Sequence, residues 1–267
     1  MPGGTTITRD GRTLGILGMI LLFSPPRVNP LRRTCFFDIM GDMRDKTLLV
    51  AGASSGIGRA VAIAAAARGA RCVLAARRED ELERTRAMMA NPERHVVAPI
   101  DFADADGRDL ALMRLFTAEG PFDAVVYTVG VCPVVPLARL DEAALMETMR
   151  VNCGGFVALM RAFAARGAHA DAGAAAVAVS SVSAQEGWPG GAAYCASKGA
   201  LSAVARALSA ELAPKRIRVE AIEPAYVLTP MFRNGAARMG VPESAAVPPE
   251  DVARDILAIL AKAAAKC

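Results

Sequence analysis

The chain has 267 residues and a formal net charge of +4, and 53% of its residues are hydrophobic while only 5% are aromatic. This length suits one large α/β domain or two small ones, and the charged fraction of 22% excludes a fully disordered chain. No apolar run approaches the roughly 18 residues of a membrane-spanning helix, and the weak charge does not favour nucleic acid as a partner. The six cysteines and two histidines form no metal-ligand motif, so we expect a cytoplasmic protein with free thiols and no metal.

Residues 1–42 differ from the rest of the chain, because they contain paired glycines, paired prolines and no sustained hydrophobic period. Arg9 and Arg12 precede an apolar run over 14–23, as in a signal peptide, but no small-residue cleavage site follows that run. We expect a poorly structured extension, or a start codon assigned too far upstream. Residues 43–267 are then expected to form a single domain.

From Lys46 onwards, short apolar runs alternate with longer segments of helical periodicity. The expected strands are 47–51, 72–76, 95–100, 124–128, 175–179 and 219–222. The expected helices are 58–68, 80–89, 109–118, 141–165, 193–212 and 251–264. This alternation predicts a Rossmann-type α/β fold, in which a doubly wound parallel sheet of six strands has helices on both faces. Such sheets bind ligands at the carboxyl ends of their strands, so we expect the chemistry there.

A glycine-rich loop joins the first expected strand to the first helix, and it reads Gly52-Ala53-Ser54-Ser55-Gly56-Ile57-Gly58. Glycines let the backbone approach a pyrophosphate, and the helix N-terminus offers unpaired amides to the phosphates. The pattern predicts a nucleotide site formed by Gly52, Ser54, Ser55, Gly56, Ile57 and Gly58. An ordinary glycine turn is the alternative, but the strand–loop–helix context favours the nucleotide.

The second expected strand ends at Ala76, where NAD-specific folds usually place an acidic residue that binds the ribose. Arg77 follows instead, and its guanidinium suits the 2′-phosphate of NADP(H). The sequence therefore favours NADP(H), with NAD(H) or a merely solvated arginine pair as the alternatives. Asp101, after the third strand, is a candidate for the adenine amino group.

Tyr194 and Lys198 are four residues apart in an expected helix and therefore share one face. A phenol is a poor acid or base at neutral pH, and we expect the lysine charge to lower the pKa of Tyr194. Ser181 follows the fifth strand and is expected to hold a substrate carbonyl oxygen beside the phenol. An isolated Tyr-x-x-x-Lys is usually a surface pair, but the upstream serines and the glycine loop favour a catalytic site.

With these motifs in this order, the chain resembles the short-chain dehydrogenase/reductase family over about 45–264. The motifs are the glycine loop, Asp101, Val151-Asn152, Ser180-Ser181, Tyr194 to Lys198 and Pro224 to Thr229. The resemblance implies that Tyr194 is the general acid–base, that Lys198 lowers its pKa and binds the nicotinamide ribose, and that Ser181 orients the reacting oxygen. Asn152 is then expected to hold a water that relays protons to Lys198.

The resemblance also implies cofactor contacts by Phe102, Gly130, Pro224, Val227 and Thr229. Four features depart from the family pattern. Residues 127–129 read Tyr-Thr-Val where the family has Asn-Asn-Ala, and Ala225 replaces a glycine. Glu220 and Glu223 stand where neutral polar residues are common. The usual seventh strand is not expected before Cys267.

The expected substrate residues are Val131, Cys132, Ser183, Trp188, Met231 and Phe232. Most are apolar and no arginine is expected to meet a carboxylate, so we expect a small, mainly apolar ketone, aldehyde or secondary alcohol. The expected activity is NADP-dependent hydride transfer by a homodimer, with a tetramer less favoured. A 3-oxoacyl-carrier-protein reductase and a non-catalytic NADP(H)-binding sensor are the alternatives. Residues 231–247 are expected to be mobile, with Arg233 solvated or facing an acidic group.

Overall fold

The computed structural model describes residues 42–165, 167–239 and 241–264. The extension expected over 1–42 therefore lies almost entirely outside the described residues, and its boundary stays a prediction. Within them, six strands form one parallel sheet in the order β3-β2-β1-β4-β5-β6. The strands are β1 (Thr47–Ala51), β2 (Arg71–Ala76), β3 (Val96–Pro99), β4 (Ala124–Tyr127), β5 (Ala174–Val179) and β6 (Ile217–Ile222). The predicted Rossmann-type α/β fold is confirmed.

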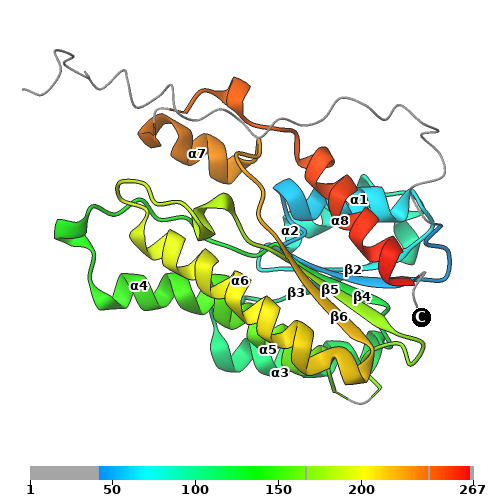
Figure 1. Cartoon of the computed structure of the whole chain (residues 1–267). Coiled ribbons are helices and arrows are strands. Elements are labelled where there is room, and N and C mark those ends of the chain that lie inside the picture. The colour runs from blue at the N-terminus through cyan, green and yellow to red at the C-terminus, as the bar shows by residue number, and fades with distance from the viewer. Residues whose placement is uncertain (1–41, 166, 240, 265–267) are drawn as a thin grey trace, which may run out of the picture. The chain divides into compact units, whose positions relative to one another are not determined.

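Helices cover both faces of this sheet. They are α1 (Gly56–Ala66), α2 (Glu79–Ala87), α3 (Ala105–Glu119), α4 (Glu142–Met149), α5 (Gly155–Phe163), α6 (Ala192–Leu212), α7 (Pro230–Met239) and α8 (Pro249–Ala264). Figure 1 shows α1, α2 and α8 on one face and α3, α5 and α6 on the other. None of the helices in the described residues is both long and apolar enough to cross a membrane.

The four central strands, β2, β1, β4 and β5, are almost wholly apolar because both of their sides are buried, whereas the edge strands β3 and β6 are only partly buried. In β1, Leu48 and Val50 pack in the core beneath α1, α2 and α8, whereas Leu49 and Ala51 pack in the core on the α3, α5 and α6 side. A strand that is buried on both faces has no polar positions to alternate with apolar ones. Continuous apolar runs were therefore the correct signal for these strands.

The strand order reverses between β1 and β4, because the chain leaves β1 towards β2 and returns at β4 on the other side. In such sheets, ligands bind at the carboxyl edge where the strand order reverses, which here is the edge between β1 and β4. The segments that follow β1, β4, β5 and β6 carry most of the predicted site residues, whereas Asn152 lies in a helical turn and Tyr194 and Lys198 lie in α6.

Two parts of the chain differ from the sequence expectation. The single helix expected over 141–165 is α4 and α5 joined by a wide π-helical turn, Arg150–Gly154. The segment expected to be mobile over 231–247 contains helix α7, and Arg233 in that helix forms an ion pair of 3.2 Å with Glu243. The other predicted helices and strands are present, with their ends shifted by a few residues.

Candidate functional site

The glycine loop closes tightly between β1 and α1. Gly52 and Gly56 have φ angles of +92° and +54°, a region that residues with a Cβ rarely adopt. A Cβ on Gly52 or Gly58 would collide with the Thr128 side chain, and one on Gly56 would lie 2.9 Å from Cγ2 of Thr229. The loop is thus a cradle of bare backbone at the N-terminus of α1, and it fits the pyrophosphate of a dinucleotide.

Two arginines follow β2. The side chain of Arg77 is 72% exposed, and its Nη1 lies 4.0 Å from a carboxylate oxygen of Asp101. Arg78 donates through Nη2 to the Ser54 hydroxyl at 3.3 Å, so it reaches the glycine loop itself. The sequence pattern points to Arg77 and misses Arg78, because only the folded loop distinguishes two adjacent arginines.

Tyr194, Lys198, Ser181 and Asn152 come together around the start of α6. The Ser181 side chain is near enough to the Tyr194 phenol to influence its pKa, and its hydroxyl accepts from the amide of Ser183 at 3.1 Å. Lys198 lies behind the phenol, with Nζ at 5.7 Å from the centroid of the ring. The ammonium donates to the Val179 carbonyl at 2.8 Å.

Burial moves the pKa values of the two α6 groups in opposite directions. It raises the pKa of Tyr194 to about 12, an effect that Ser181 opposes only in part, and it lowers the pKa of Lys198 to about 8. The spacing of the pair predicts that Lys198 lowers the pKa of the phenol, but here desolvation raises that pKa above its usual value. The phenol therefore keeps its proton at neutral pH in this structure, as a general acid requires.

Asn152 is completely buried in the wide turn, and its side chain is hydrogen-bonded to the loop after β4. Its Oδ1 accepts from the Val131 amide at 2.8 Å, and its Nδ2 donates to the Val131 carbonyl at 2.9 Å and to the Ser197 hydroxyl at 2.8 Å. Both N–H groups of the Asn152 side chain thus already donate to protein acceptors. The water that is expected to relay protons to Lys198 would therefore have to bind an oxygen atom of this turn. Gly130 borders the same groups, since a Cβ on it would lie 3.5 Å from Nζ of Lys198.

Of the residues that replace the family's Asn-Asn-Ala, Tyr127 is buried and Thr128 is partly buried, and both side chains are hydrogen-bonded. Thr128 donates to the Ala51 carbonyl at 2.9 Å, and Tyr127 donates to the Val151 carbonyl. The Phe102 side chain is buried against the Tyr127 ring, with 5.6 Å between centroids. Phe102 therefore has only its backbone to offer a cofactor.

The segment after β6 returns to the glycine loop. The Pro224 carbonyl accepts from the Val182 amide at 3.1 Å, Val227 is buried, and Thr229 lies against Gly56. Of these predicted cofactor residues, Thr229 therefore borders the cradle directly.

The model of the family described as short chain dehydrogenase matches residues 46–239. The chain belongs to the short-chain dehydrogenase family. Members of this family are oxidoreductases that bind NAD(P)(H). The chain is 32% identical over 201 residues to L-xylulose reductase of Bos taurus, covering 74% of this chain and 77% of that protein.

Solved short-chain dehydrogenases share the fold. A short-chain type dehydrogenase/reductase from Mycobacterium marinum has a TM-score of 0.74 and 26% identity, covering 84% of this chain and 91% of that one. A single-residue variant of actinorhodin polyketide ketoreductase, solved with NADPH, has a TM-score of 0.72 and 23% identity, covering 83% and 92%. This second likeness concerns the fold alone.

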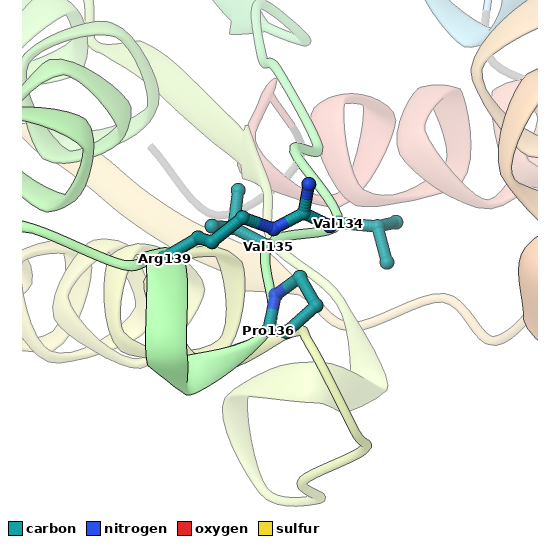
Figure 2. Close-up of a pocket in the computed structure, with 4 residues that line it drawn as sticks. All are labelled: Val134, Val135, Pro136 and Arg139. Atoms are coloured by element: carbon teal, nitrogen blue, oxygen red, sulfur yellow. The ribbon is translucent and has the colours of Figure 1, made fainter.

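A pocket of about 520 Å³ opens beside the loop after β4 in this short-chain dehydrogenase. Its lining residues are Val134, Val135, Pro136 and Arg139. The Val135 amide donates to the Gly190 carbonyl at 2.9 Å, which holds the pocket next to the start of α6. Figure 2 shows the Arg139 side chain directed from its short helix towards Val134. Arg139 lines this pocket and none of the catalytic side chains does, so the expectation that no arginine meets a substrate carboxylate stays a prediction.

None of the six predicted substrate residues lines this pocket. Trp188 lies nearest the chemistry, with its ring centroid 6.4 Å from that of Tyr194 and its Nε1 donating to the Ser183 hydroxyl at 3.2 Å. Burial raises the pKa of the Cys132 thiol to about 11, so it stays protonated and is no nucleophile.

Met231 and Phe232 lie in α7, the first exposed and the second buried. Within the described residues, no group of three His, Cys, Asp or Glu side chains is placed to hold a metal ion.

Proposed function

We propose that this short-chain dehydrogenase is an NADPH-dependent carbonyl reductase that acts on a small, mainly apolar substrate. One observation carries the proposal. A protonated, partly buried phenol lies beside Ser181 and Lys198, in a chain whose glycine loop forms a backbone cradle that fits a dinucleotide. This is the arrangement that delivery of a proton to a carbonyl oxygen requires.

The cofactor is proposed to bind at the carboxyl edge of the sheet. The glycine loop holds the pyrophosphate, Asp101 the adenine, and Lys198 the nicotinamide ribose, with Gly130, Pro224, Val227 and Thr229 around the nicotinamide. Arg77, exposed at the end of β2, pairs with the 2′-phosphate, which favours NADP(H) over NAD(H). When bound, NADPH supplies the hydride.

The chain's own residues handle the oxygen and the proton. Ser181 orients the substrate carbonyl oxygen, and Tyr194 transfers its phenolic proton to that oxygen as negative charge develops there. Lys198, still protonated at neutral pH, stabilises the resulting phenolate.

The substrate class is proposed from the pocket beside α6. Three of its four lining residues are apolar, which suits an apolar carbonyl compound. The name of the Bos taurus relative, L-xylulose reductase, also denotes the reduction of a carbonyl compound.

Arg139 favours a second candidate, reduction of a 3-oxoacyl group on a carrier protein. It takes part in none of the ion pairs formed by the described residues, so its guanidinium is available to the phosphate of a carrier arm. Arg233, the arginine considered from sequence, is instead paired with Glu243.

The assembly and compartment are also proposed. Met146 on α4 and Val157 on α5 are 56% and 44% exposed, and such apolar side chains on neighbouring helices suit a homodimer interface. The four cysteines Cys72, Cys132, Cys153 and Cys195 are free thiols, which fits the cytoplasm.

A panel of carbonyl compounds tests the proposal. Apolar ketones and aldehydes, keto acids and a 3-oxoacyl thioester are each mixed with enzyme and either NADPH or NADH, and loss of reduced-nicotinamide absorbance is followed. We expect turnover of the apolar compounds, faster with NADPH. Preference for the thioester would favour the second candidate. Tight NADPH binding without turnover of any compound would contradict both and favour a non-catalytic sensor.

A further inference from the structure

The turn that carries Asn152 leaves a backbone carbonyl without its usual partner. In an α-helix the Gly155 amide would donate to the Val151 carbonyl, four residues back. Here it donates to the Arg150 carbonyl, five residues back. The Val151 carbonyl is therefore released, in a segment where Val151 and Asn152 are both buried, and such a group needs another donor.

Tyr127 supplies that donor. It is the last residue of β4, is completely buried, and its hydroxyl donates to the Val151 carbonyl at 2.5 Å. Its ring is fixed on two sides, with centroids 5.6 Å from Phe102 in an edge-on contact and 5.6 Å from Phe156. The hydroxyl is therefore aimed at the turn by packing that does not depend on the hydrogen bond.

Gly155 provides the space that this hydrogen bond needs. A Cβ on Gly155 would collide with the Tyr127 hydroxyl and would lie 3.2 Å from Cζ of the same ring and 3.3 Å from Phe102. Gly155 and Tyr127 are thus complementary in shape, because the missing Cβ leaves room for the phenol. An asparagine, which the family has at this position, is too short to reach across in the same way.

Two further hydrogen bonds join the same strand end to the same turn. Asn152 accepts from the Val131 amide and donates to the Val131 carbonyl, and Val131 is four residues beyond Tyr127. Gly130, beside the Lys198 ammonium, lies between these attachments. A shift of the turn would therefore move Asn152, Val131 and the approach to Lys198 together.

We infer that Tyr127 is a positioning residue, whose hydroxyl holds the wide turn so that Asn152 can set the backbone at Gly130 and Val131 against Lys198. The inference rests on the proposed function, because it concerns how that catalytic site is held. It also explains why a tyrosine is compatible with activity where the family has asparagine.

Tyr127→Phe removes the hydroxyl and keeps the ring. We expect kcat to fall about tenfold, since small misplacement of catalytic groups is costly, while the dissociation constant of NADPH changes less than about threefold. Hydrogen exchange should become faster in peptides covering 150–156 and 128–133. The matched control is Thr148→Val, which removes another buried hydroxyl, one that donates to the Ala144 carbonyl at 2.9 Å one turn earlier. The control should lose similar stability and keep wild-type kcat.

Equal kcat in wild type, Tyr127→Phe and Thr148→Val would overturn the inference, as would unchanged exchange in the two peptides. A failure of the proposed function looks different, because the wild type itself would then show no turnover on the carbonyl panel. In that case hydrogen exchange still tests whether the Tyr127 hydroxyl positions the turn. Faster exchange confined to the turn and the loop after β4, in Tyr127→Phe and not in the control, supports positioning by the hydroxyl.

Discussion

At the scale of single residues, burial sets the protonation states of Lys198 and Tyr194 in the site. Lys198 is buried and its ammonium has one protein acceptor within the described residues, the Val179 carbonyl. Desolvation therefore lowers its pKa to about 8, and the nearby Tyr194 keeps its proton. A charge that is poorly compensated in the folded state is costly there, so it makes stability depend on pH.

The lysine effect can be isolated by comparing wild type with Lys198→Met. Below pH 8 the lysine is protonated in both the folded and the unfolded chain. Between about pH 8 and its unfolded pKa near 10.4, the unfolded chain binds more protons, so stability rises with pH. As the pH rises from about 8 to about 10, the free energy of unfolding of the wild type should increase by about 2 kcal/mol relative to that of Lys198→Met. Denaturant unfolding at several pH values measures this, and a constant difference would refute the lowered pKa.

Arg77 is the residue proposed to select the cofactor. Arg77→Asp should lower kcat/KM for NADPH by roughly 10- to 100-fold, the value of a charge-assisted hydrogen bond, and should not lower it for NADH. Arg114→Asp, an exposed arginine in α3 on the opposite face of the sheet, is the charge-matched control. Equal losses for both cofactors, or none, would place the 2′-phosphate elsewhere, with Arg78 the next residue to test.

At the scale of helices and strands, the sequence predicted the elements that are determined by a local hydrophobic pattern. Both-face burial produced continuous apolar runs in the four central strands, and the glycine loop was evident from its position between β1 and α1. The wide turn at Arg150–Gly154 was missed because one extra residue in a helical turn does not change the apolar pattern. The position of Arg139 in a pocket with Val134 and Pro136 was missed because periodicity does not report which side chains of a loop line a pocket.

The glycine loop gives a prediction at this scale. Gly56→Ala combines a positive φ with a Cβ 2.9 Å from Thr229, so we expect a loss of about 1–2 kcal/mol in stability and weaker NADPH binding. Gly187→Ala is the control, because a Cβ there meets nothing within 4 Å. Thermal unfolding and a fluorescence titration with NADPH would measure both effects. Equal behaviour of the two variants would mean that the loop is not a phosphate cradle.

At the scale of the whole molecule, the parallel sheet brings separate motifs to one edge. The glycine loop follows β1, Gly130 follows β4, Ser181 follows β5 and Thr229 follows β6, so residues far apart in sequence meet where the strand order reverses. The order of motifs along the chain predicted this convergence. It could not predict how Tyr127 would compensate for the changed Asn-Asn-Ala position, since that depends on a carbonyl released by a helix on another part of the chain.

The central claim is that Tyr194 transfers the proton in a site that binds NADPH independently of it. Tyr194→Phe removes one hydroxyl and keeps the ring beside Trp188. NADPH binding, followed by fluorescence, and turnover of the best carbonyl substrate are measured on the same preparation. We expect binding within about threefold of wild type and turnover lower by about 1,000-fold, as for loss of a general acid. Turnover within about tenfold of wild type would contradict the mechanism.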